Sequence, residues 1–442
     1  MTSSIDGLVS GLSTSSLISS LMQVEAAPQT RLKTKVSDAQ TAVASYQSVN
    51  SKLSALRNAA DDLSQLSTWR AVKPISSSTS VTATATGGTN TTTGTVQFDV
   101  VQLAKGQVST ARVDPTAAVT ASDSITVQIG TADPVVIDIS KDKTAQGISN
   151  AINAAGIGVK ASVVTTGGAQ NILQLNGAKT GEDNAFNVTG LEDTGLTTAV
   201  FAQNAVLQVG GDDASGGYGV VSSTNTFTGL MAGVSLTVGK EETGVTITVN
   251  SDVSGMASKI QAMVDAANAT LSEIDKQTAY DPGTKKGSPL TGDFSVREMS
   301  NAILSAVSRG LSYDDPANPG NTINFGSLKK LGIELDRSGQ LTFNADTFKS
   351  AYNADPTGIK NAGIGLGDTF EALGKKQSDG ITSVITGRKN QIDSMNSQID
   401  DWDVRLAAKR EALQRQYTGL ETALSNLKSQ SSWLSGQIAS LG

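Results

Sequence analysis

The C-terminal segment carries the pattern that most restricts how this chain can fold. From Ile385 onward, apolar side chains recur at alternating four- and three-residue steps. This spacing is close to a heptad repeat, so it predicts one helix with a narrow apolar stripe, roughly 90 Å long at ~1.5 Å per residue. The pattern slips between Lys409 and Tyr417, and such a slip locally unwinds a coiled coil. A helix with so narrow a stripe must bury it against a partner.

A second helical pattern lies near the N-terminus. Apolar residues from Leu32 to Leu63 recur at three- and four-residue steps, which predicts a helix of roughly 50 Å at ~1.5 Å per residue. Pro28 fits the first turn of this helix, where the missing N–H is tolerated. We expect this helix to be the intramolecular partner of the C-terminal helix. Neighbouring subunits are the other candidates.

The middle of the chain has a different composition. After Pro74, segments rich in threonine and valine alternate with glycine and asparagine, which predicts short strands over residues 75–250. One helix is expected within this region, at 144–153, and helical spacing returns at Asp252. An insertion between two helical halves keeps the termini together. The sequence therefore predicts an α+β multidomain fold, with terminal coiled-coil helices and a helical-bundle domain that carries a β-rich double-domain insertion.

The helical return after Asp252 contains several expected local elements. Asp293 is a candidate N-cap for a helix that carries an apolar stripe as far as Leu311. Ile333–Phe343 predicts a hairpin and Asp346–Tyr352 a short helix. We expect four parts in all: an N-terminal leg at 1–45, a helical domain with a small hairpin at 46–75 and 252–380, a β-rich head of two subdomains at 76–251, and a C-terminal coiled-coil leg at 381–442.

Two missing residue types restrict the chemistry. The chain has 442 residues but contains neither cysteine nor histidine, so disulfides and Ser-His-Asp or Cys-His catalysis are excluded and the commonest metal ligands are absent. The formal net charge of −7 argues against nucleic-acid binding. The sequence has no run of about 20 apolar residues, so no membrane-spanning helix is expected. We therefore expect no enzyme, and no cofactor, metal, nucleic acid or membrane as a partner.

The N-terminus also bears on export. The first basic residue is Arg31, so the basic start of a cleaved signal peptide is not expected. If the protein is exported, we expect a route that reads an uncleaved polar N-terminus.

Several short motifs could be interpreted as ligand sites, but their spacing favours surface loops. The Gly-Ile-Gly-Leu-Gly run at 363–367 lacks the spacing of a dinucleotide fingerprint and a preceding strand. The acidic groups at 212–213 and 182–184 lack EF-hand spacing, so solvated turns are expected. The Asp-Asp pair at 314–315 is also expected in a surface loop. No carboxylate pair with nearby aromatic platforms suggests a glycosidase.

Five segments carry a resemblance to a known family. In order along the chain they are IDGLVSGLSTSSLISSLMQVEAAPQTRLK near the N-terminus, TVQFDVVQLAKGQ at 95–107, a segment at about 125–190, the pair at 288–308 and 328–356, and the C-terminal coiled-coil segment. The third segment, with a core of Ile148, Ile152, Asn153 and Ala154, resembles the hook IN motif of flagellar axial proteins. Together the five resemble the flagellar hook-associated protein 2 (FliD) family of bacterial filament caps.

This resemblance implies a function and a set of partners. It implies a secreted cap at the growing tip of the flagellum, exported through the flagellar type III channel, that promotes folding and insertion of exported flagellin and prevents its loss to the medium. It also implies a ring-like homo-oligomer. The implied partners are flagellin, hook–filament junction proteins and a cytoplasmic export chaperone that binds the C-terminal helix.

Two groups of residues follow as candidate contact sites. The first would form the self-assembling leg helices: Leu32, Val36, Val43, Leu53, Ile392, Ile399, Trp402 and Leu406. The second would contact the chaperone or the filament: Leu413, Leu420, Leu424, Leu427, Trp433 and Leu434. Two alternative functions remain open. The chain could be a surface adhesin that binds host mucin or glycans through residues 75–250, or a hook–filament junction protein.

Overall fold

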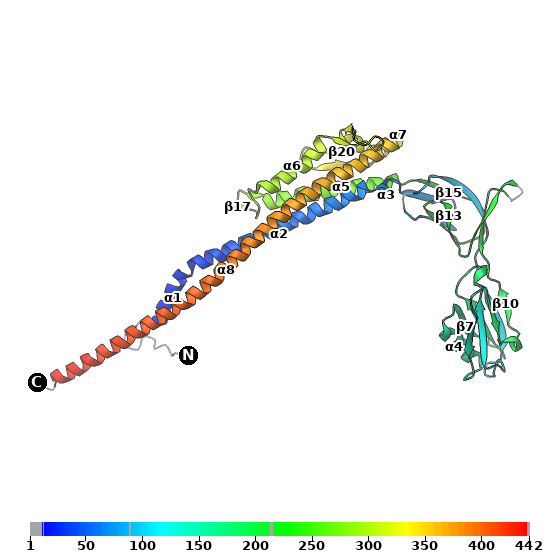
Figure 1. The fold of residues 1–442 in the computed structure, drawn as a ribbon, viewed down its shortest axis with the longest axis horizontal. Helices are drawn as coiled ribbons and strands as arrows, with labels where there is room; N and C mark the ends of the chain where they lie inside the picture. Colours follow the sequence, from blue (N-terminus) through cyan, green and yellow to red (C-terminus); the bar gives the residue numbers. More distant parts are fainter. Residues whose placement is uncertain (1–10, 12, 88–89, 212–214, 440–442) are drawn as a thin grey trace. The chain divides into compact units, whose positions relative to one another are not determined.

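The computed structural model describes residues 11, 13–87, 90–211 and 215–439. The chain forms two compact units (Figure 1). A helical unit comprises Met1–Ser64 and Ala257–Gly442, and a β-rich unit comprises Gln65–Met256. Long helices and several small sheets confirm the predicted α+β multidomain fold. Among the described residues, no helix is both long and apolar enough to cross a bilayer.

Two long helices dominate the helical unit. Helix α1 (Thr14–Glu25) is followed by α2 (Ala27–Ser64), in which Pro28 lies in the first turn as predicted. Helix α8 (Pro356–Ala439) has 84 residues, and α2 and α8 lie side by side. Buried apolar side chains of α2 recur at steps of three, four or seven residues: Val36, Val43, Tyr46, Val49, Leu53, Leu56, Ala60 and Leu63.

Helix α8 is longer than the sequence analysis predicted. It begins after Asp355, whose carboxylate accepts a hydrogen bond from the Gly358 amide at 2.9 Å, and it has no break between residues 380 and 381. The prediction of a loop at 363–367 was wrong, because this glycine run lies inside α8.

The reason for these glycines is close packing. A Cβ atom on Gly367 would lie 2.7 Å from the carbonyl oxygen of Ala60 in α2, and one on Gly365 would overlap Tyr313. Glycine costs about 1 kcal/mol in a helix interior, but here it allows α8 to approach its neighbours. Tertiary contact therefore explains a composition that resembles a loop.

Shorter elements complete the helical unit. Helix α5 (Val253–Thr278) continues into the β16–β17 hairpin (Tyr280–Asp281 and Lys286–Gly287) and then α6 (Phe294–Ser308). The remaining elements are β18 (Leu311–Asp314), β19 (Thr322–Gly326), η4 (Leu328–Leu331), β20 (Ile333–Leu335), β21 (Leu341–Phe343) and α7 (Ala345–Ala354). The predicted hairpin at 333–343 and the following short helix are confirmed.

The start of α6 was predicted correctly and its end was not. The side chain of Asp293 accepts hydrogen bonds from the amides of Ser295 at 2.9 Å and Val296 at 3.3 Å, as an N-cap does. However, Leu311 does not extend the α6 stripe, because the helix ends at Ser308 and Leu311 begins β18. Gly310, with φ 79°, turns the chain between them.

The β-rich unit contains two clusters of buried side chains. After α3 (Leu66–Trp69), the first cluster lies between a five-stranded sheet, in the order β1-β15-β3-β11-β12, and a three-stranded sheet, β13-β14-β2. The strand bounds are β1 Val72–Ser76, β2 Val81–Ala85, β3 Gly94–Gln102, β11 Ala205–Val209, β12 Tyr218–Ser222, β13 Thr226–Met231, β14 Val234–Val238 and β15 Glu242–Ser251.

The second cluster includes the segment that resembles the hook IN motif. Its sheets run in the orders β10-β4-β8-β7 and β6-β5-β9, and α4 (Ala145–Ala155) buries Ile148 and Ile152 completely. The strands are β4 Val108–Val113, β5 Ser124–Ile129, β6 Val135–Asp138, β7 Val159–Thr165, β8 Asn171–Gly177, β9 Phe186–Thr189 and β10 Thr197–Val200. The short turns η1 (Glu182–Asn184) and η2 (Glu192–Thr194) connect them.

Candidate assembly surfaces on the helical unit

The first group of predicted contact residues lies in the seam between α2 and α8. Val36, Val43, Leu53 and Ile392 are buried, with exposed fractions of 8% or less. The rest of the group is half-buried: Leu32, Ile399, Trp402 and Leu406. The structure therefore brings residues from the two ends of the sequence together within one chain.

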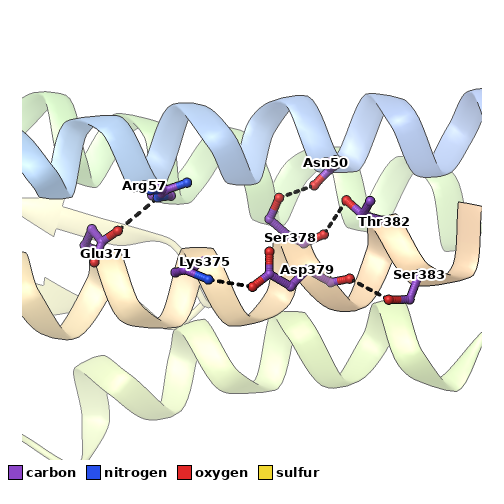
Figure 2. Close-up of polar contacts among 8 residues, drawn as sticks. All are labelled: Asn50, Arg57, Glu371, Lys375, Ser378, Asp379, Thr382 and Ser383. Carbon is purple, nitrogen blue, oxygen red and sulfur yellow. Dashed lines mark hydrogen bonds and ion pairs between the residues drawn. The ribbon is translucent and has the colours of Figure 1, made fainter.

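Polar contacts fix the antiparallel register of this seam. Figure 2 shows Arg57 of α2 beside Glu371 of α8, with Nε 2.9 Å from the carboxylate oxygen. In the same view, the Ser378 hydroxyl donates to the Asn50 side chain at 2.7 Å. As the residue number falls along α2 it rises along α8, which is the antiparallel arrangement.

The same register continues toward the start of α2. The side-chain amide of Gln29, which is 5% exposed, donates to the Ile399 carbonyl at 3.2 Å and to the Asp403 carboxylate at 2.6 Å. Glu25, at the end of α1, forms an ion pair with Lys409 at 3.4 Å. Because these contacts join polar groups at defined positions, they oppose sliding of one helix along the other.

A buried polar cluster joins α2 to the start of α6. The Tyr46 hydroxyl donates to the Asp293 carboxylate. Burial raises the pKa of Tyr46, the Asp293 charge raises it further, and the nearby Arg388 guanidinium partly opposes this. Burial alone would raise the pKa of Asp293, but hydrogen bonds from Ser295, Tyr46 and Val296 outweigh it and lower that pKa. The sequence predicted the Asp293 cap but not its tyrosine partner, which is separated from it by a long stretch of chain.

The second group of predicted contact residues lies toward the C-terminal end of α8. Leu420 is 49% exposed, Leu427 61%, Trp433 67% and Leu434 54%, whereas Leu413 and Leu424 are half-buried. Single exposed apolar residues are common on protein surfaces. A recurring exposed stripe along one helix is instead typical of an interaction surface.

Helix α1 adds further exposed apolar surface. Leu17 is 40% exposed, Leu21 41% and Val24 74%, at four- and three-residue steps along one side of the helix. A groove of about 570 Å³ lies between α1 and α8, with Met22 and Leu406 in its lining. The sequence analysis included this segment in the family resemblance but named none of its residues as contact sites.

Two of the acidic motifs lie in or directly beside turns. Across the described residues, no group of three or more acidic side chains is placed to hold a metal ion. Residues 182–184 form the turn η1, and the Asp315 carboxylate accepts a hydrogen bond from the Ala317 amide at 2.9 Å within a turn. The pair at 212–213 lies outside the described residues.

A groove of about 610 Å³ lies beside the turn at Asp315 and beside Asp314, which ends β18 and does not lie in the expected loop. Tyr313, Pro316 and Asp368 are among the residues that line it. Burial raises the pKa of Asp368, and the neighbouring charges of Glu371 and Asp314 raise it further. This groove is therefore an acidic surface feature of the helical unit.

Comparisons with known proteins support one family over most of the chain. The model of the flagellar hook-associated protein 2 C-terminus matches residues 202–429, and the model of its N-terminus matches residues 10–107. Flagellar hook-associated protein 2 of Escherichia coli (strain K12) is 28% identical over 98% of this chain and 97% of its own length. The lateral flagellar hook-associated protein 2 of Vibrio parahaemolyticus serotype O3:K6 is 26% identical over 78% of this chain and 81% of its own length.

A solved structure extends the likeness to the fold. The crystal structure of the flagellar cap protein FliD D1-D2-D3 domains from Escherichia coli superposes with a TM-score of 0.59 and 25% sequence identity. It covers 78% of this chain and 99% of its own. Because the C-terminal family model alone matches more than half of the residues, this chain belongs to the flagellar hook-associated protein 2 (FliD) family.

Proposed function

We infer that this chain caps the growing flagellar filament, promotes folding and insertion of exported flagellin, and prevents flagellin loss to the medium. One observation carries this inference: the chain matches nearly the full length of hook-associated protein 2, and the solved relative is a flagellar cap protein. The function is that of a structural assembly protein. Its place is outside the cell, at the tip of the flagellum.

The two-unit construction supports a mechanical role. The helical unit provides a long antiparallel helix pair, and the β-rich unit provides two separately packed clusters. A cap of this kind needs legs that enter the filament and a head that shelters incoming subunits. Folding of flagellin would supply the free energy, so the chain itself needs no nucleotide.

The partners follow from this role. We propose a ring-like homo-oligomer that contacts flagellin and the hook–filament junction proteins, with legs at residues 1–45 and 381–442 and a head at 76–251. The exposed stripe of α8, with Leu420, Leu427 and Leu434, would bind the export chaperone before export and the filament afterwards. Its exposure supports this assignment, since a buried stripe would be inaccessible to either partner.

The alternative functions have less support. The relatives are named for the flagellar hook, and the solved structure for the flagellar cap; none of these names refers to adhesion. Binding of host mucin by the β-rich unit therefore has no supporting observation, and the C-terminal family model argues for hook-associated protein 2 over a junction protein.

Deletion of the gene in its host tests the inference. We expect hooks without filaments by electron microscopy, and monomeric flagellin in the spent medium. Expression of the wild-type chain from a plasmid should restore filaments and is the control for effects on neighbouring genes. Normal filaments in the deletion strain would contradict the cap function.

A further inference from the structure

The section of the α2–α8 pair near the start of α2 exposes charges of opposite sign. On α8, the exposed residues Asp393, Asp400 and Asp403 are acidic, and on α2 the exposed residues Arg31 and Lys35 are basic. Within the part of the chain that the structure describes, none of these five forms an ion pair. Asp403 also accepts a hydrogen bond from the Gln29 amide, but none of the five is neutralised by an opposite charge among the described residues, so another molecule can supply that charge.

The acidic residues share one side of α8. Asp393 directly follows Ile392, and Asp400 directly follows Ile399, two residues that face α2. Seven- and three-residue steps place Asp393, Asp400 and Asp403 on the same side of a helix with about 3.6 residues per turn. This side begins where the seam with α2 ends.

The basic residues also flank the seam, on α2. Each directly precedes a seam residue in the sequence, whereas two of the acidic residues of α8 directly follow one. Arg31 directly precedes Leu32, and Lys35 directly precedes Val36, both of which are turned toward α8. A four-residue step places Arg31 and Lys35 on one side of the helix.

The antiparallel geometry places these two groups on opposite sides of the helix pair. Each residue advances about 100° around a right-handed helix. In an antiparallel pair, residues that directly follow the seam on either helix share one side of the pair, and residues that directly precede it share the other. The carboxylates of α8 and the cations of α2 therefore point away from each other, which explains the lack of ion pairs between them.

Other exposed charges in this section reduce the contrast without removing it. Lys33 directly follows Leu32, and Lys389 lies one turn before Asp393; both join the acidic side, which then has three carboxylates and two cations. By the same geometry, Arg405 joins the basic side together with Asp38 and Asp401, which gives three cations and two carboxylates. One side is net negative and the other net positive.

Both sides also lie at the same height along the pair. Gln29 of α2 is hydrogen-bonded to Ile399 and Asp403 of α8 at 3.2 and 2.6 Å. Arg31 is two residues further along α2 and is therefore level with the turn of α8 that precedes Ile399. The acidic and basic sides thus face outward from one cross-section of the leg.

We propose that neighbouring copies of this chain pack these leg sections side by side, with the Arg31 and Lys35 side of one copy against the Asp393, Asp400 and Asp403 side of the next. The occupant is a second copy because each side has its charge complement on the opposite side of the same leg. Such a contact is heterologous, and because both sides lie at one height, its repetition adds no axial offset and allows a closed ring. The proposal rests on the ring-like oligomer proposed above and assigns the residues that meet in it.

The charges would set orientation and partner choice more than affinity. Exposed ion pairs are individually weak, but complementary charges fix the register of an interface and disfavour wrong pairings. Two sides of like charge would repel, so the charges favour one rotational order of the legs around the ring.

Charge reversal in the full-length chain tests the proposal. Asp393→Lys with Asp400→Lys makes both sides basic, and Arg31→Glu with Lys35→Glu makes both sides acidic. Asp403 is left unchanged because it holds Gln29. We expect each double variant to self-associate about tenfold or more weakly in sedimentation velocity, because two attractive pairs become repulsive.

Mixing the two double variants tests the pairing of the sides more directly. Mixed in equal amounts, the two double variants present opposite charges to each other and should associate again. A chain with all four reversals should self-associate like the wild type. The control matched to the Asp393→Lys, Asp400→Lys variant is Asp275→Lys with Glu298→Lys, which makes the same change in net charge at exposed positions of α5 and α6 and should associate normally.

Two results would overturn the proposal, and they are distinguishable from failure of the ring itself. Double variants that associate like the wild type, with unchanged circular dichroism, would exclude these charges from the contact. Variants that stay apart when mixed would exclude this pairing of sides. A wild-type chain that stays monomeric at every concentration would contradict the proposed ring as well.

Discussion

Along α8, apolar side chains recur at the same three- and four-residue steps from Ile385 to Ile438, but their exposure changes along the helix. Ile392 and Met395 are 8% exposed, whereas Leu427 is 61% and Ile438 64% exposed. The first part of α8 lies against α2, and its register with α2 is fixed by contacts as far as Asp403. The comparison teaches that a periodic stripe predicts a helix with a partner, but does not tell which chain supplies that partner.

The glycines of α8 show the same contrast. Gly367 and Gly374 lie against α2, where a Cβ atom would come within 2.7 Å of the Ala60 carbonyl oxygen and 3.1 Å of the Arg57 Cβ atom. Around Gly419 and Gly436, a Cβ atom would meet nothing within 4 Å. The first pair therefore allows close packing, and the second pair only lowers helix stability.

Truncation of one leucine in each part of the leg should give the largest difference in stability. Leu53→Ala removes a side chain that is fully buried in the seam, and we expect it to lower the free energy of unfolding by about 2–5 kcal/mol. Leu427→Ala removes an exposed side chain and should change it by less than about 0.5 kcal/mol. Chemical denaturation followed by circular dichroism measures both, and equal losses would contradict the packing described here.

Alanine at two glycines should give smaller effects of opposite sign. Gly367→Ala forces a Cβ atom against the backbone of α2 and should destabilise the helical unit by about 1–3 kcal/mol. Gly419→Ala meets no neighbour and should stabilise its section of α8 by about 1 kcal/mol. The midpoint of thermal unfolding and the helical circular dichroism signal report the two changes, and stabilisation by both substitutions would show that α8 does not approach α2 closely.

Charge on the exposed stripe should separate function from stability. Leu420→Asp with Leu427→Asp should alter the free energy of unfolding by less than about 0.5 kcal/mol, yet disrupt leg packing or chaperone binding because it places carboxylates on an apolar contact surface. We expect shorter filaments and reduced swimming in the host. Val404→Asp, at a residue that is 72% exposed and off the stripe, is the control. Normal swimming and filament length in the double variant would contradict the assignment of the exposed α8 stripe as a contact surface.

Much of the fold could be predicted from the sequence because periodicity and capping are local signals. The stripes of α2 and α8, the Asp293 cap and the hairpin at 333–343 all follow from short-range patterns, and the structure contains each of them. The wrong predictions arose where contacts with residues distant in the sequence determine the local structure. The glycine run at 363–367 has the composition of a loop, and only its contacts with Ala60 and Tyr313 reveal why a helix needs it.

The candidate contact surfaces were less predictable than the helices that carry them. Spacing places Ile399 and Leu427 on equivalent stripes, but the seam covers only the first. The side on which a charge such as Arg31 or Asp400 lies depends on the antiparallel register, which Gln29 and its partners on α8 reveal. The Tyr46–Asp293 contact likewise joins residues 247 positions apart, a pairing that no local pattern carries.

The pairing of β1 with β15 has a consequence for how such proteins can vary. Val72 lies opposite Ser251, and the amide of Asp252 donates to the Ala71 carbonyl at 2.8 Å, so the chain leaves for the β-rich unit and returns from it at one point. Insertions or replacements between those residues need not move the ends that join the helices, and added length costs only about 0.6 kcal/mol of closure entropy per doubling of a flexible loop. The β-rich unit can therefore diverge in size and surface among species while the helical unit that carries the legs keeps its register.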